Sequence, residues 1–505
     1  MGAEWPVYQV SELEYQGKLL VQDGNHGEYR PRKSEFLDDG VAFIRAADFS
    51  SGAVNFHGAE KINLTALKRL RKGIGKDLDT VMSTKGTVGK IAFVPQGSPF
   101  YVCSPQTSFW RSLDHSFLLP EFLFYEMQSR QFVEQVGSRK GETDMAAYLS
   151  LTSQRSLYIR VPGIDVQKKV VAHASSLDKK IKINHKINQN LEQMAQALFK
   201  SWFVDFEPVK AKIAARQRWQ ALQPENEPAS PVCYAAELDE QPAVGDLDTY
   251  MNRAAMQAIS GKTTEQLDAL RAEVPERYNE LFETAALFSS AMQESELGAI
   301  PEGWDCLPLD SIAHYQNGLA LQKYRPENED DYLPVVKITQ LKKGVADGEE
   351  KASPDIKPEC IIDDGDVIFS WSGSLMVDIW CGGRAALNQH LFKVTSSSYP
   401  KWLYYHFTRH HLEEFQRIAE SKAVTMGHIK REHLKQALCA IPYEPLLEAA
   451  GHQLGNQLGK QIILRLESKT LSNLRNTLLP KLLSGELTIS SVEEARTEPQ
   501  EAAHV

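Results

Sequence analysis

The longest regular pattern in the chain lies at residues 170–202, which read VVAHASSLDKKIKINHKINQNLEQMAQALFKSW. Positions separated by alternating steps of four and three residues are mostly apolar there, as in the seam of a coiled coil. These positions are Val170, Ala174, Leu177, Ile181, Asn184, Asn188, Leu191, Ala195, Leu198 and Trp202. Asparagine at a seam position costs stability but fixes the register and the number of partners. The stretch therefore predicts a long helix that pairs with another helix.

A second helix of the same kind is predicted 280 residues further along the chain. Its seam is also apolar at both ends and polar in the middle, and consists of Leu454, Gln457, Gln461, Leu464, Ser468, Leu471, Arg475, Leu478 and Leu482. The simplest arrangement pairs the two helices with each other, antiparallel, within one molecule. The alternative is two unrelated amphipathic helices, each packed on its own domain.

The segments before these helices also repeat. Four pairs of segments match at offsets of 280 to 287 residues, and the small drift fits differences in loop length. The pairs are Met82–Gly86 with Phe369–Gly373, Gln106 with Gln389, Leu119–Tyr125 with Tyr399–Tyr405, and Ile159–Pro162 with Cys439–Pro442. The chain therefore has the order globular unit, helix, globular unit, helix.

Each globular unit combines strands with helices. Short β-favouring runs bounded by turn residues occur at 41–45, 90–94, 366–370 and 391–394, whereas 119–136 and 400–418 have a helical period. We predict an α+β fold in which two strand-rich units are separated by two long helices that pair as an antiparallel coiled coil. The predicted parts are a first unit (1–165), a spacer helix (166–206), an acidic linking insert (207–300), a second unit (301–442), a C-terminal spacer helix (443–488) and an acidic, disordered tail (489–505).

The charge of the chain is unevenly distributed. The net charge is −10, but residues 221–300 hold fifteen acidic and four basic side chains, so the remainder is close to neutral. Residues 61–76 hold six basic and no acidic side chains, which fits a local basic face or an ordinary solvated helix. The chain shows no signal peptide and no apolar run of ~18 residues, so we expect a cytoplasmic protein without a membrane segment. Six widely spaced cysteines indicate reduced, mostly buried thiols rather than metal ligands.

Several segments resemble the specificity subunits of type I restriction-modification systems. Residues 195–209 (AQALFKSWFVDFEPV) resemble their central region, and 478–487 (LLPKLLSGEL) resemble their C-terminal end. Residues 85–90 (KGTVGK) and 388–392 (NQHLF) are similar to recurring pieces of their target recognition domains. The stretch from about Ala211 to Ala299 is longer than in many members of this family, and we assign it no role.

This resemblance implies a non-catalytic subunit that recognises a bipartite, asymmetric sequence in double-stranded DNA. The family member carries two methyltransferase subunits along its paired helices, and restriction/translocase subunits join them. S-adenosylmethionine, ATP and magnesium are then expected on the partner subunits, with no cofactor or metal on this chain and a prokaryotic cytoplasmic location. A 33-residue helix spans roughly 50 Å, enough to separate two units by more than the ~34 Å of one DNA turn.

Motifs for catalysis are missing from the sequence. It contains no N-P-P-Y or D-P-P-Y tetrad and no G-x-G-x-x-G loop. Ser260–Thr263 ends like a phosphate-binding loop but has Met256 where a glycine is required, and Pro354-Asp355 lacks the acid and lysine of a nuclease. His428 and His433 are five residues apart, not the four that suit a metal site on a helix. These gaps disfavour a fused type II-like modification and restriction enzyme; a coiled-coil scaffold without a DNA role is the other alternative.

Base recognition is expected from loops of the two units, where polar side chains reach base edges or phosphates. The candidates are Arg30, Arg32, Lys33, Lys85, Thr87, Lys90, Gln106, Arg139, Lys140, Ser372, Ser374, Gln389, His390 and Lys422. The glycines beside Lys85 and Ser372 allow close approach to a phosphate, or simply form hairpin turns. The glutamines and His390 contact bases or satisfy buried backbone groups, and the basic residues contact phosphates or serve solubility.

Overall fold

The computed structural model describes residues 5–24, 29–50, 52–139, 141–143, 146–222, 246–328, 330–421 and 427–484. The chain forms two compact units, the first from Met1–Lys182 with Lys469–Val505 and the second from Ile183–Ser468. Each unit contains one part of the long helix α6 (Ile164–Phe203) and one part of α17 (Asn456–Ser484). Within the described ranges, no helix is long and apolar enough to cross a membrane.

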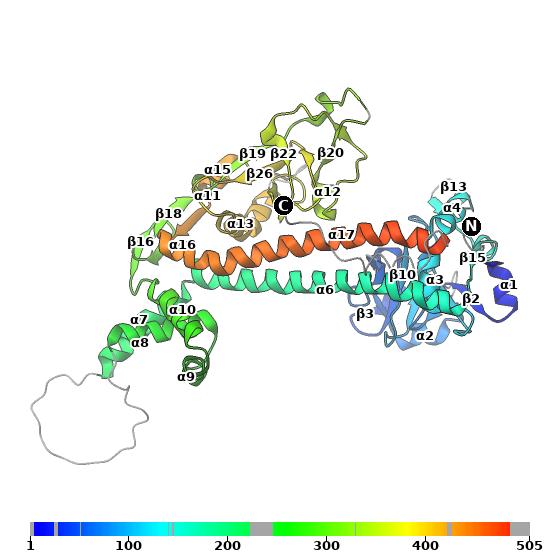
Figure 1. Cartoon of the computed structure of the whole chain (residues 1–505), viewed down its shortest axis with the longest axis horizontal. Coiled ribbons are helices and arrows are strands. Elements are labelled where there is room, and N and C mark those ends of the chain that lie inside the picture. The colour runs from blue at the N-terminus through cyan, green and yellow to red at the C-terminus, as the bar shows by residue number, and fades with distance from the viewer. Residues whose placement is uncertain are drawn as a thin grey trace, which may run out of the picture. The chain divides into compact units, whose positions relative to one another are not determined.

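Inside each unit the parts of α6 and α17 lie side by side (Figure 1). In the first unit, Arg475 Nη1 lies 2.6 Å from Asp178 Oδ1. In the second unit, Asn184 Nδ2 donates to Glu467 Oε2 at 2.8 Å. The partner number on α17 falls as α6 advances, so the helices are antiparallel. Every predicted seam position on both helices is buried or half-buried, which confirms the predicted antiparallel coiled coil.

The first unit contains two main sheets. One has the order β2 (Leu19–Asp23), β12 (Thr107–Ser112), β9 (Thr80–Ser83), β10 (Ile91–Phe93), β6 (Ala53–Val54), β5 (Phe49–Ser50). The other has the order β3 (Phe36–Leu37), β7 (Lys61–Ile62), β4 (Val41–Ile44), β11 (Tyr101–Cys103), β8 (Ile74–Gly75). Two-stranded pairs are β1 (Val7–Gln9) with β15 (Tyr158–Arg160) and β13 (Gly141–Thr143) with β14 (Ala146–Tyr148). The helices are α1 (Val10–Tyr15), α2 (Leu64–Arg69), α3 (Pro120–Met127), α4 (Arg130–Arg139) and α5 (Leu151–Arg155).

The second unit is built on the same plan. Its sheets are β19 (His314–Asn317), β26 (Leu391–Thr395), β23 (Val367–Ser370), β24 (Met376–Ile379), and β21 (Lys351–Ala352), β20 (Leu333–Val336), β25 (Ala385–Leu387), β22 (Ile361–Ile362). A pair joins β18 (Asp305–Pro308) to β27 (Leu438–Ile441). The helices are α11 (Leu309–Ile312), α12 (Ile338–Lys343), α13 (Lys401–His410), α14 (Leu412–Ser421), α15 (Arg431–Gln436) and α16 (Glu444–Ala450).

Strand pairing confirms the sequence repeat. The antiparallel order β2-β12-β9-β10 of the first unit corresponds to β19-β26-β23-β24 of the second. A parallel pair, β4 with β11 and β20 with β25, occurs in both. We call the part of each unit outside the long helices and the insert its recognition part. The first and last strands of each recognition part also pair, β1 with β15 and β18 with β27. In each repeat the chain therefore enters and leaves through two neighbouring, paired strands.

Some predicted helices are interrupted. The helical stretches 119–136 and 400–418 are each two helices, α3 with α4 and α13 with α14. The C-terminal stretch begins with α16 and a π-helical turn at Gly451–Gly455 before α17 starts. The glycines of this turn face Trp402, because a Cβ on either would lie 3.3–3.4 Å from the indole ring. The wider turn therefore makes room for that side chain.

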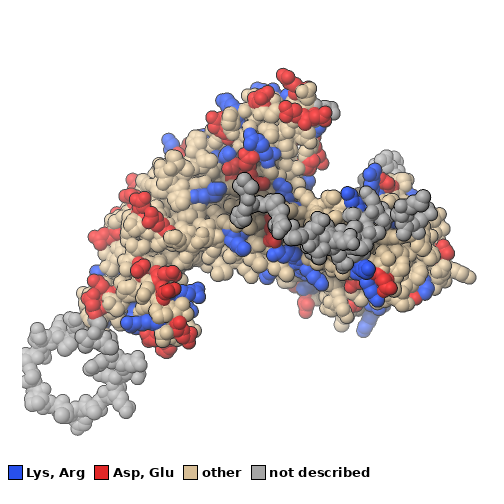
Figure 2. Space-filling view, viewed as in Figure 1, with Lys and Arg blue, Asp and Glu red and all other residues tan. Residues whose placement is uncertain are grey.

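The insert is a helical element with a small core of its own. Its described part consists of α7 (Glu207–Leu222), α8 (Leu247–Ser260), α9 (Thr264–Glu273), α10 (Pro275–Ala286) and the hairpin β16 (Met292–Ser295) with β17 (Gly298–Pro301). The core is formed by Ala255, Met256, Leu267, Tyr278 and Ala285. Figure 2 shows acidic and basic side chains side by side on the visible face of these helices. Residues 223–245 of the predicted acidic stretch and the tail at 489–505 lie outside the described residues.

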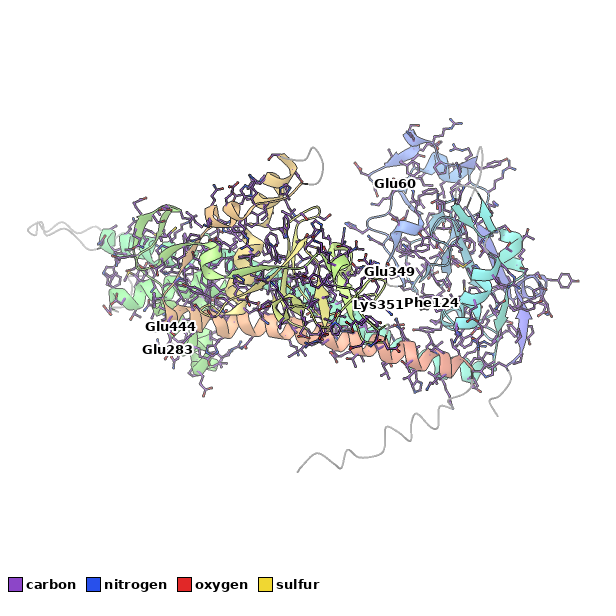
Figure 3. All side chains as sticks on the ribbon, turned by 90° about the horizontal axis from the view of Figure 1, so that it is seen from above. Glu60, Phe124, Glu283, Glu349, Lys351 and Glu444 are labelled. Atoms are coloured by element: carbon purple, nitrogen blue, oxygen red, sulfur yellow. The ribbon has the colours of Figure 1, made fainter. Side chains whose placement is uncertain are left out.

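The two ends of the insert are joined to each other and to the core of the second unit, to which Val209, Phe288 and Ile300 belong. Lys212 of α7 donates to the carbonyl of Phe288 at 2.6 Å, and burial lowers the pKa of this lysine to about 8. The Tyr443 hydroxyl, beside α16, donates to the carbonyl of Leu287. Figure 3 shows Glu283 of α10 and Glu444 of α16 at this junction. The two ends of the insert therefore pack against the core of the second unit.

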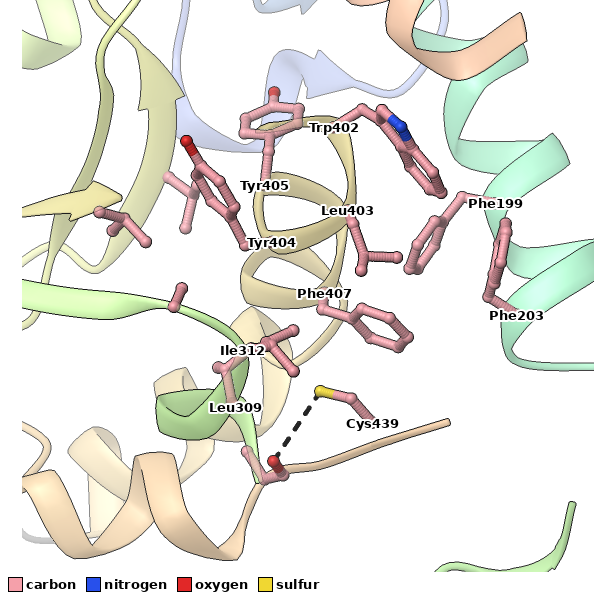
Figure 4. Close-up of a cluster of buried hydrophobic side chains, with 14 of the residues drawn as sticks. Phe199, Phe203, Leu309, Ile312, Trp402, Leu403, Tyr404, Tyr405, Phe407 and Cys439 are labelled. Atoms are coloured by element: carbon pink, nitrogen blue, oxygen red, sulfur yellow. Dashed lines mark hydrogen bonds between the residues drawn. The ribbon is translucent and has the colours of Figure 1, made fainter. Parts of the chain in front are cut away.

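Helix α13 joins the second recognition part to α6. Trp402, Leu403 and Phe407 of α13 point toward Phe199 and Phe203 of α6 (Figure 4). The rings of Phe199 and Phe407 meet edge to face at 4.9 Å. In the first unit, Val170 and Ala174 of α6 and Leu479, Leu482 and Leu483 of α17 join the core that contains α3. Each recognition part is therefore packed on both long helices.

Candidate nucleic-acid interface

Three loops of the first unit are joined by backbone hydrogen bonds at the end of β9. The Thr84 amide donates to the Gln106 carbonyl at 2.7 Å, which joins the loop after β9 to the loop before β12. The Leu149 amide donates to the Thr84 carbonyl at 2.8 Å, and the Gly86 amide donates to the Ala147 carbonyl at 3.0 Å. The segment after β13 is thereby added as the third loop.

The second unit repeats these bonds. The Trp371 amide donates to the His390 carbonyl (3.4 Å), the Ile429 amide to the Trp371 carbonyl (3.0 Å), and the Gly373 amide to the Gly427 carbonyl (2.9 Å). Thr84 and Gly86 correspond to Trp371 and Gly373 at offset 287, and the third loops correspond at offset 280. The same three-loop site is therefore built twice, once in each unit.

An acid, buried in the first unit and half-buried in the second, anchors the strand that leads into each site. In the first unit, Asp79 accepts hydrogen bonds from Arg111 Nε (2.6 Å), the Tyr101 hydroxyl (3.1 Å) and the Lys76 amide (2.9 Å). The equivalent Asp366 lies 2.8 Å from Lys393 Nζ and accepts from the Asp363 amide at 2.8 Å. The acid-rich turns before the site strands thus hold β9 and β23 in place.

The loop after β9 directs its predicted DNA-binding side chains outward. Lys85, Thr87 and Lys90 are exposed, and so is Gln106 on the neighbouring loop. Buried Ser83 holds the loop from inside, since its hydroxyl donates to the Thr87 carbonyl and accepts from the Lys90 amide at 2.9 Å. The structure therefore brings these four candidates to one rigid surface.

The glycine of each turn is required by its backbone. Gly86 has φ +78° and Gly373 has φ +66°, a region that other residues rarely adopt. A Cβ on Gly86 would meet no atom within 4 Å, so conformation rather than crowding explains this glycine. The hairpin-turn interpretation of the glycines is therefore correct for this position, and it does not conflict with a phosphate contact.

The corresponding side chains of the second unit differ. Ser374 and Gln389 are exposed, and His390 is half-buried. Ser372 is buried, and its hydroxyl shares a hydrogen bond of 3.0 Å with His390 Nδ1. The Trp371 ring lies beside the same imidazole, with 6.0 Å between centroids. Ser372 thus orients His390 from below, and any DNA contact by Ser372 itself remains a prediction.

Sequence reasoning missed the side chains of the third loop. The backbone of Tyr148 forms an isolated antiparallel β-bridge with that of Lys85, and the equivalent His428 forms one with Ser372. The offset of 280 relates these two residues, but they share no residue type, so the repeat did not draw attention to them. His428 is exposed, whereas His433 is buried on α15. In the described part of the chain, no group of three His, Cys, Asp or Glu side chains is arranged to hold a metal ion.

A fourth loop starts beside each site at a glycine. A Cβ on Gly24 would lie 2.2 Å from the Ser104 carbonyl oxygen, and one on Gly318 would lie 2.3 Å from that of Leu387. Only glycine fits at either position, so the backbone of this loop packs directly on the loop that carries Gln106 or Gln389. Arg30, Arg32 and Lys33 follow Gly24 and are exposed.

The remaining basic candidates are less well placed. Arg139 at the end of α4 is half-buried and donates to the Ser156 hydroxyl at 3.1 Å. Lys140 and Lys422 lie outside the described residues. Among the cysteines, Cys103, Cys360, Cys381 and Cys439 are buried and Cys306 is half-buried, each as an unpaired thiol, while Cys233 lies outside the described residues.

Comparison with known proteins gives one consistent family. A family model for the type I restriction modification DNA specificity domain matches residues 23–193 and 301–463. The chain is 28% identical over 386 residues to the type I restriction enzyme HindI specificity subunit of Haemophilus influenzae, covering 73% of this chain and 78% of that protein. It is 23% identical over 423 residues to the MjaIX specificity subunit of Methanocaldococcus jannaschii, covering 81% and 79%. The crystal structure of a type I restriction-modification S subunit from M. genitalium covers 95% of this chain and 96% of that chain at 10% identity and a TM-score of 0.44.

Proposed function

The chain belongs to the type I restriction modification DNA specificity family, and we propose that each of its two three-loop sites recognises one half of a split DNA sequence. As the specificity subunit of such a system, it is the component that recognises DNA. The proposal adds the division of labour: the first unit binds one half-site, and the second unit binds the other.

The observation that carries this proposal is one backbone frame with two different sets of side chains. The first site presents Lys85, Thr87, Lys90 and Gln106. Ser374, Gln389, His390 and His428 occupy the second. Donors and acceptors of different kinds pair with different base edges in the major groove. Two such sites therefore favour a target whose halves differ in sequence.

We assign the chemistry to partner subunits. The expected methyltransferase subunits would bring S-adenosylmethionine, and the restriction subunits would bring ATP and magnesium. In the second unit, α6 exposes Ile183, Ile187 and Met194 and α17 exposes Ile463, all apolar side chains on the outside of the helix pair. Apolar side chains that face solvent on a helix are a common docking surface for a protein partner. They support methyltransferase binding along this part of the helices.

Base-resolution mapping of methylated adenine in the source organism, with and without this gene, tests the proposal. Loss of methylation at one asymmetric, gapped motif on deletion would support it and would give both half-sites. Unchanged methylation would count against it. A cheaper test is the salt dependence of duplex binding: with ~6–10 phosphate contacts, affinity should fall ~10³- to 10⁵-fold between 50 and 200 mM salt. A coiled-coil scaffold without a DNA role would show no such binding.

A further inference from the structure

In each unit, a tyrosine of the recognition part donates its hydroxyl group to a carboxylate of α6. Tyr125 on α3 donates to Asp178 Oδ2 at 2.8 Å. Tyr405 on α13 donates to Glu192 Oε1 at 3.4 Å. The two tyrosines are 280 residues apart and occupy the same place in the repeat. This polar contact is thus common to both modules, although the loops around it have diverged.

Each carboxylate also binds the C-terminal helix. Asp178 Oδ1 accepts from Arg475 Nη1 at 2.6 Å. With the Gln461 amide in the orientation that matches donors to acceptors, its nitrogen donates to Glu192 Oε2 at 2.9 Å and its oxygen accepts from the Glu192 backbone amide at 3.3 Å. Each acid therefore joins three elements: the recognition part, α6 and α17. We call the two groups the Asp178 node and the Glu192 node.

The Glu192 node also contains one cation, as the Asp178 node does with Arg475. Arg409 of α13 places Nη1 2.8 Å from Glu192 Oε1 and donates to the Tyr405 hydroxyl at 3.0 Å. Burial and the adjacent carboxylate raise the pKa of both Tyr125 and Tyr405, so both hydroxyls keep the proton that they donate. Both nodes are therefore charge-assisted networks, which are stronger and more directional than neutral contacts.

The position of the two acids on α6 is regular. Asp178 and Glu192 each follow a seam leucine, Leu177 and Leu191, and are two heptads apart, so they occupy the same heptad position. The residues that meet them on α17, Arg475 and Gln461, are polar seam positions. Two of the four polar positions in the second seam, Gln461 and Arg475, are thus explained by these acids.

We propose that Asp178 and Glu192 are positioning residues that fix the orientation of each recognition part on the helix pair, and with it the gap between half-sites that the protein accepts. Apolar packing, such as that of Phe199 on Phe407, tolerates small rotations of the recognition part against the helices. A hydrogen bond weakens steeply when its donor–hydrogen–acceptor angle departs from linear. A carboxylate that binds both helices and the recognition part at once resists such rotation. The inference rests on the function proposed above.

The test uses full-length Tyr125→Phe and Tyr405→Phe variants, expressed with the partner subunits in cells that carry a reporter series. Each reporter holds the mapped half-sites with the natural gap, or with a gap one base pair shorter or longer. We expect either variant to lower the methylation preference for the natural gap about tenfold, equal to ~1.4 kcal/mol, with the recognised bases unchanged. Glu192→Asp and Asp178→Glu, which keep the charge, should retain part of the preference.

Tyr404→Phe is the matched control. Tyr404 is buried on the same helix as Tyr405, and within the described residues its hydroxyl has no hydrogen bond. This variant should keep the wild-type gap preference. A variant that loses methylation equally at all three gaps, or that keeps the natural preference, would overturn the positioning role but leave the recognition function standing. If the wild-type protein directs methylation to no gapped motif at all, the proposed function fails, and the positioning role fails with it.

Discussion

Replacing Asp79 by asparagine tests how the first recognition site is held. The Asp79 side chain is fully buried and accepts hydrogen bonds from Arg111 Nε at 2.6 Å and from Arg111 Nη2 at 2.8 Å. In Asp79→Asn, the arginine keeps its charge with only 16% of its side chain exposed. Removing one partner of a buried pair costs ~3–5 kcal/mol, because the other charge is left uncompensated. We therefore expect the first unit to lose ~4 kcal/mol of unfolding free energy at neutral pH.

The repeat supplies a matched control in the second unit. Asp366 pairs with Lys393 at 2.8 Å, and Lys393 is 19% exposed, about as much as Arg111. Asp366 itself is 22% exposed, whereas Asp79 is fully buried, so water can reach the position of the Asp366 carboxylate and solvate the ammonium group after substitution. Asp366→Asn should therefore cost only ~1–2 kcal/mol. The two substitutions are chemically identical and occupy equivalent strands, so the expected difference comes from the burial of the acid and from the two-nitrogen contact that Arg111, unlike Lys393, makes with it.

Hydrogen exchange of the full-length protein measures both effects. Protection of the amides in β9 and β12 should fall roughly 1000-fold in Asp79→Asn, with β23 and β26 unaffected. Asp366→Asn should lower protection in β23 and β26 by a smaller factor and spare the first unit. Equal losses in the two variants, or a loss below ~1 kcal/mol in Asp79→Asn, would refute the argument that burial of the pair sets its contribution.

Three further perturbations have expected outcomes. Replacing Met1–Val161 with the first unit of another family member should change one half-site only, as mapped by adenine methylation; a change in both halves would contradict the modular arrangement. Inserting one heptad into α6 alone should disrupt helix pairing, whereas matched insertions in α6 and α17 should change the accepted gap; an unchanged gap in the folded double variant would exclude a spacer role. Burial lowers the pKa of His406 from 6.5 to about 3. Between these pH values the histidine is therefore protonated in the unfolded chain but neutral in the folded chain. Stability of the second unit should therefore fall as pH drops from 6.5 toward 3, by at most ~1.4 kcal/mol per pH unit, and urea unfolding of His406→Phe should show a smaller slope; equal slopes would contradict this.

The helix pair was predictable because its signal is local and periodic. A seam needs only alternating spacings of four and three, and every position named from the sequence is buried or half-buried in the structure. What periodicity could not reveal is the partner of each polar seam residue. Arg475 meets Asp178, and Gln461 meets Glu192, both outside the seam of α6. Such contacts depend on the three-dimensional register, which no single helix encodes.

The recognition sites were predictable only in part. Gly86 and Gly373 stand at equivalent positions of the two modules, and Gln106 and Gln389 lie on equivalent loops, so the repeat identified two of the three loops. The match of the glutamines is one residue out of register, because His390 accepts the bond that corresponds to the one accepted by Gln106. The third loop carries Tyr148 in one unit and His428 in the other, and divergence in side chain concealed a common backbone. Residue type also does not give orientation: Ser374 faces solvent, whereas Ser372, two residues earlier, is buried. Residues two apart on an extended segment share a face, so the difference comes from the turn at Gly373 between them, whose φ is +66°.

The insert shows the limit of composition as a guide. The excess of acidic residues did not predict a structure for the insert, although its sequence contains local signals for the ends of helices. Gly261, with φ +66°, ends α8 in the left-handed conformation, and Thr263 begins α9 with a capping box to Gln266. The Ser260–Thr263 segment is therefore the junction of two helices, which gives this short likeness to a phosphate-binding loop a structural explanation.

The two sites separate the frame from the specificity. Backbone amides and carbonyls hold the three loops together in both units, and any residue except proline supplies both groups. The frame restricts residue type only where the backbone conformation or a buried hydrogen bond requires it, as at Gly86, Gly373 and Ser83. Exposed positions such as Lys85 and Ser374 carry none of these bonds, so their replacement costs little stability, about 0.5 kcal/mol or less. Because the bonds of each site lie within its own unit, one half-site can change by substitution without disturbing the other.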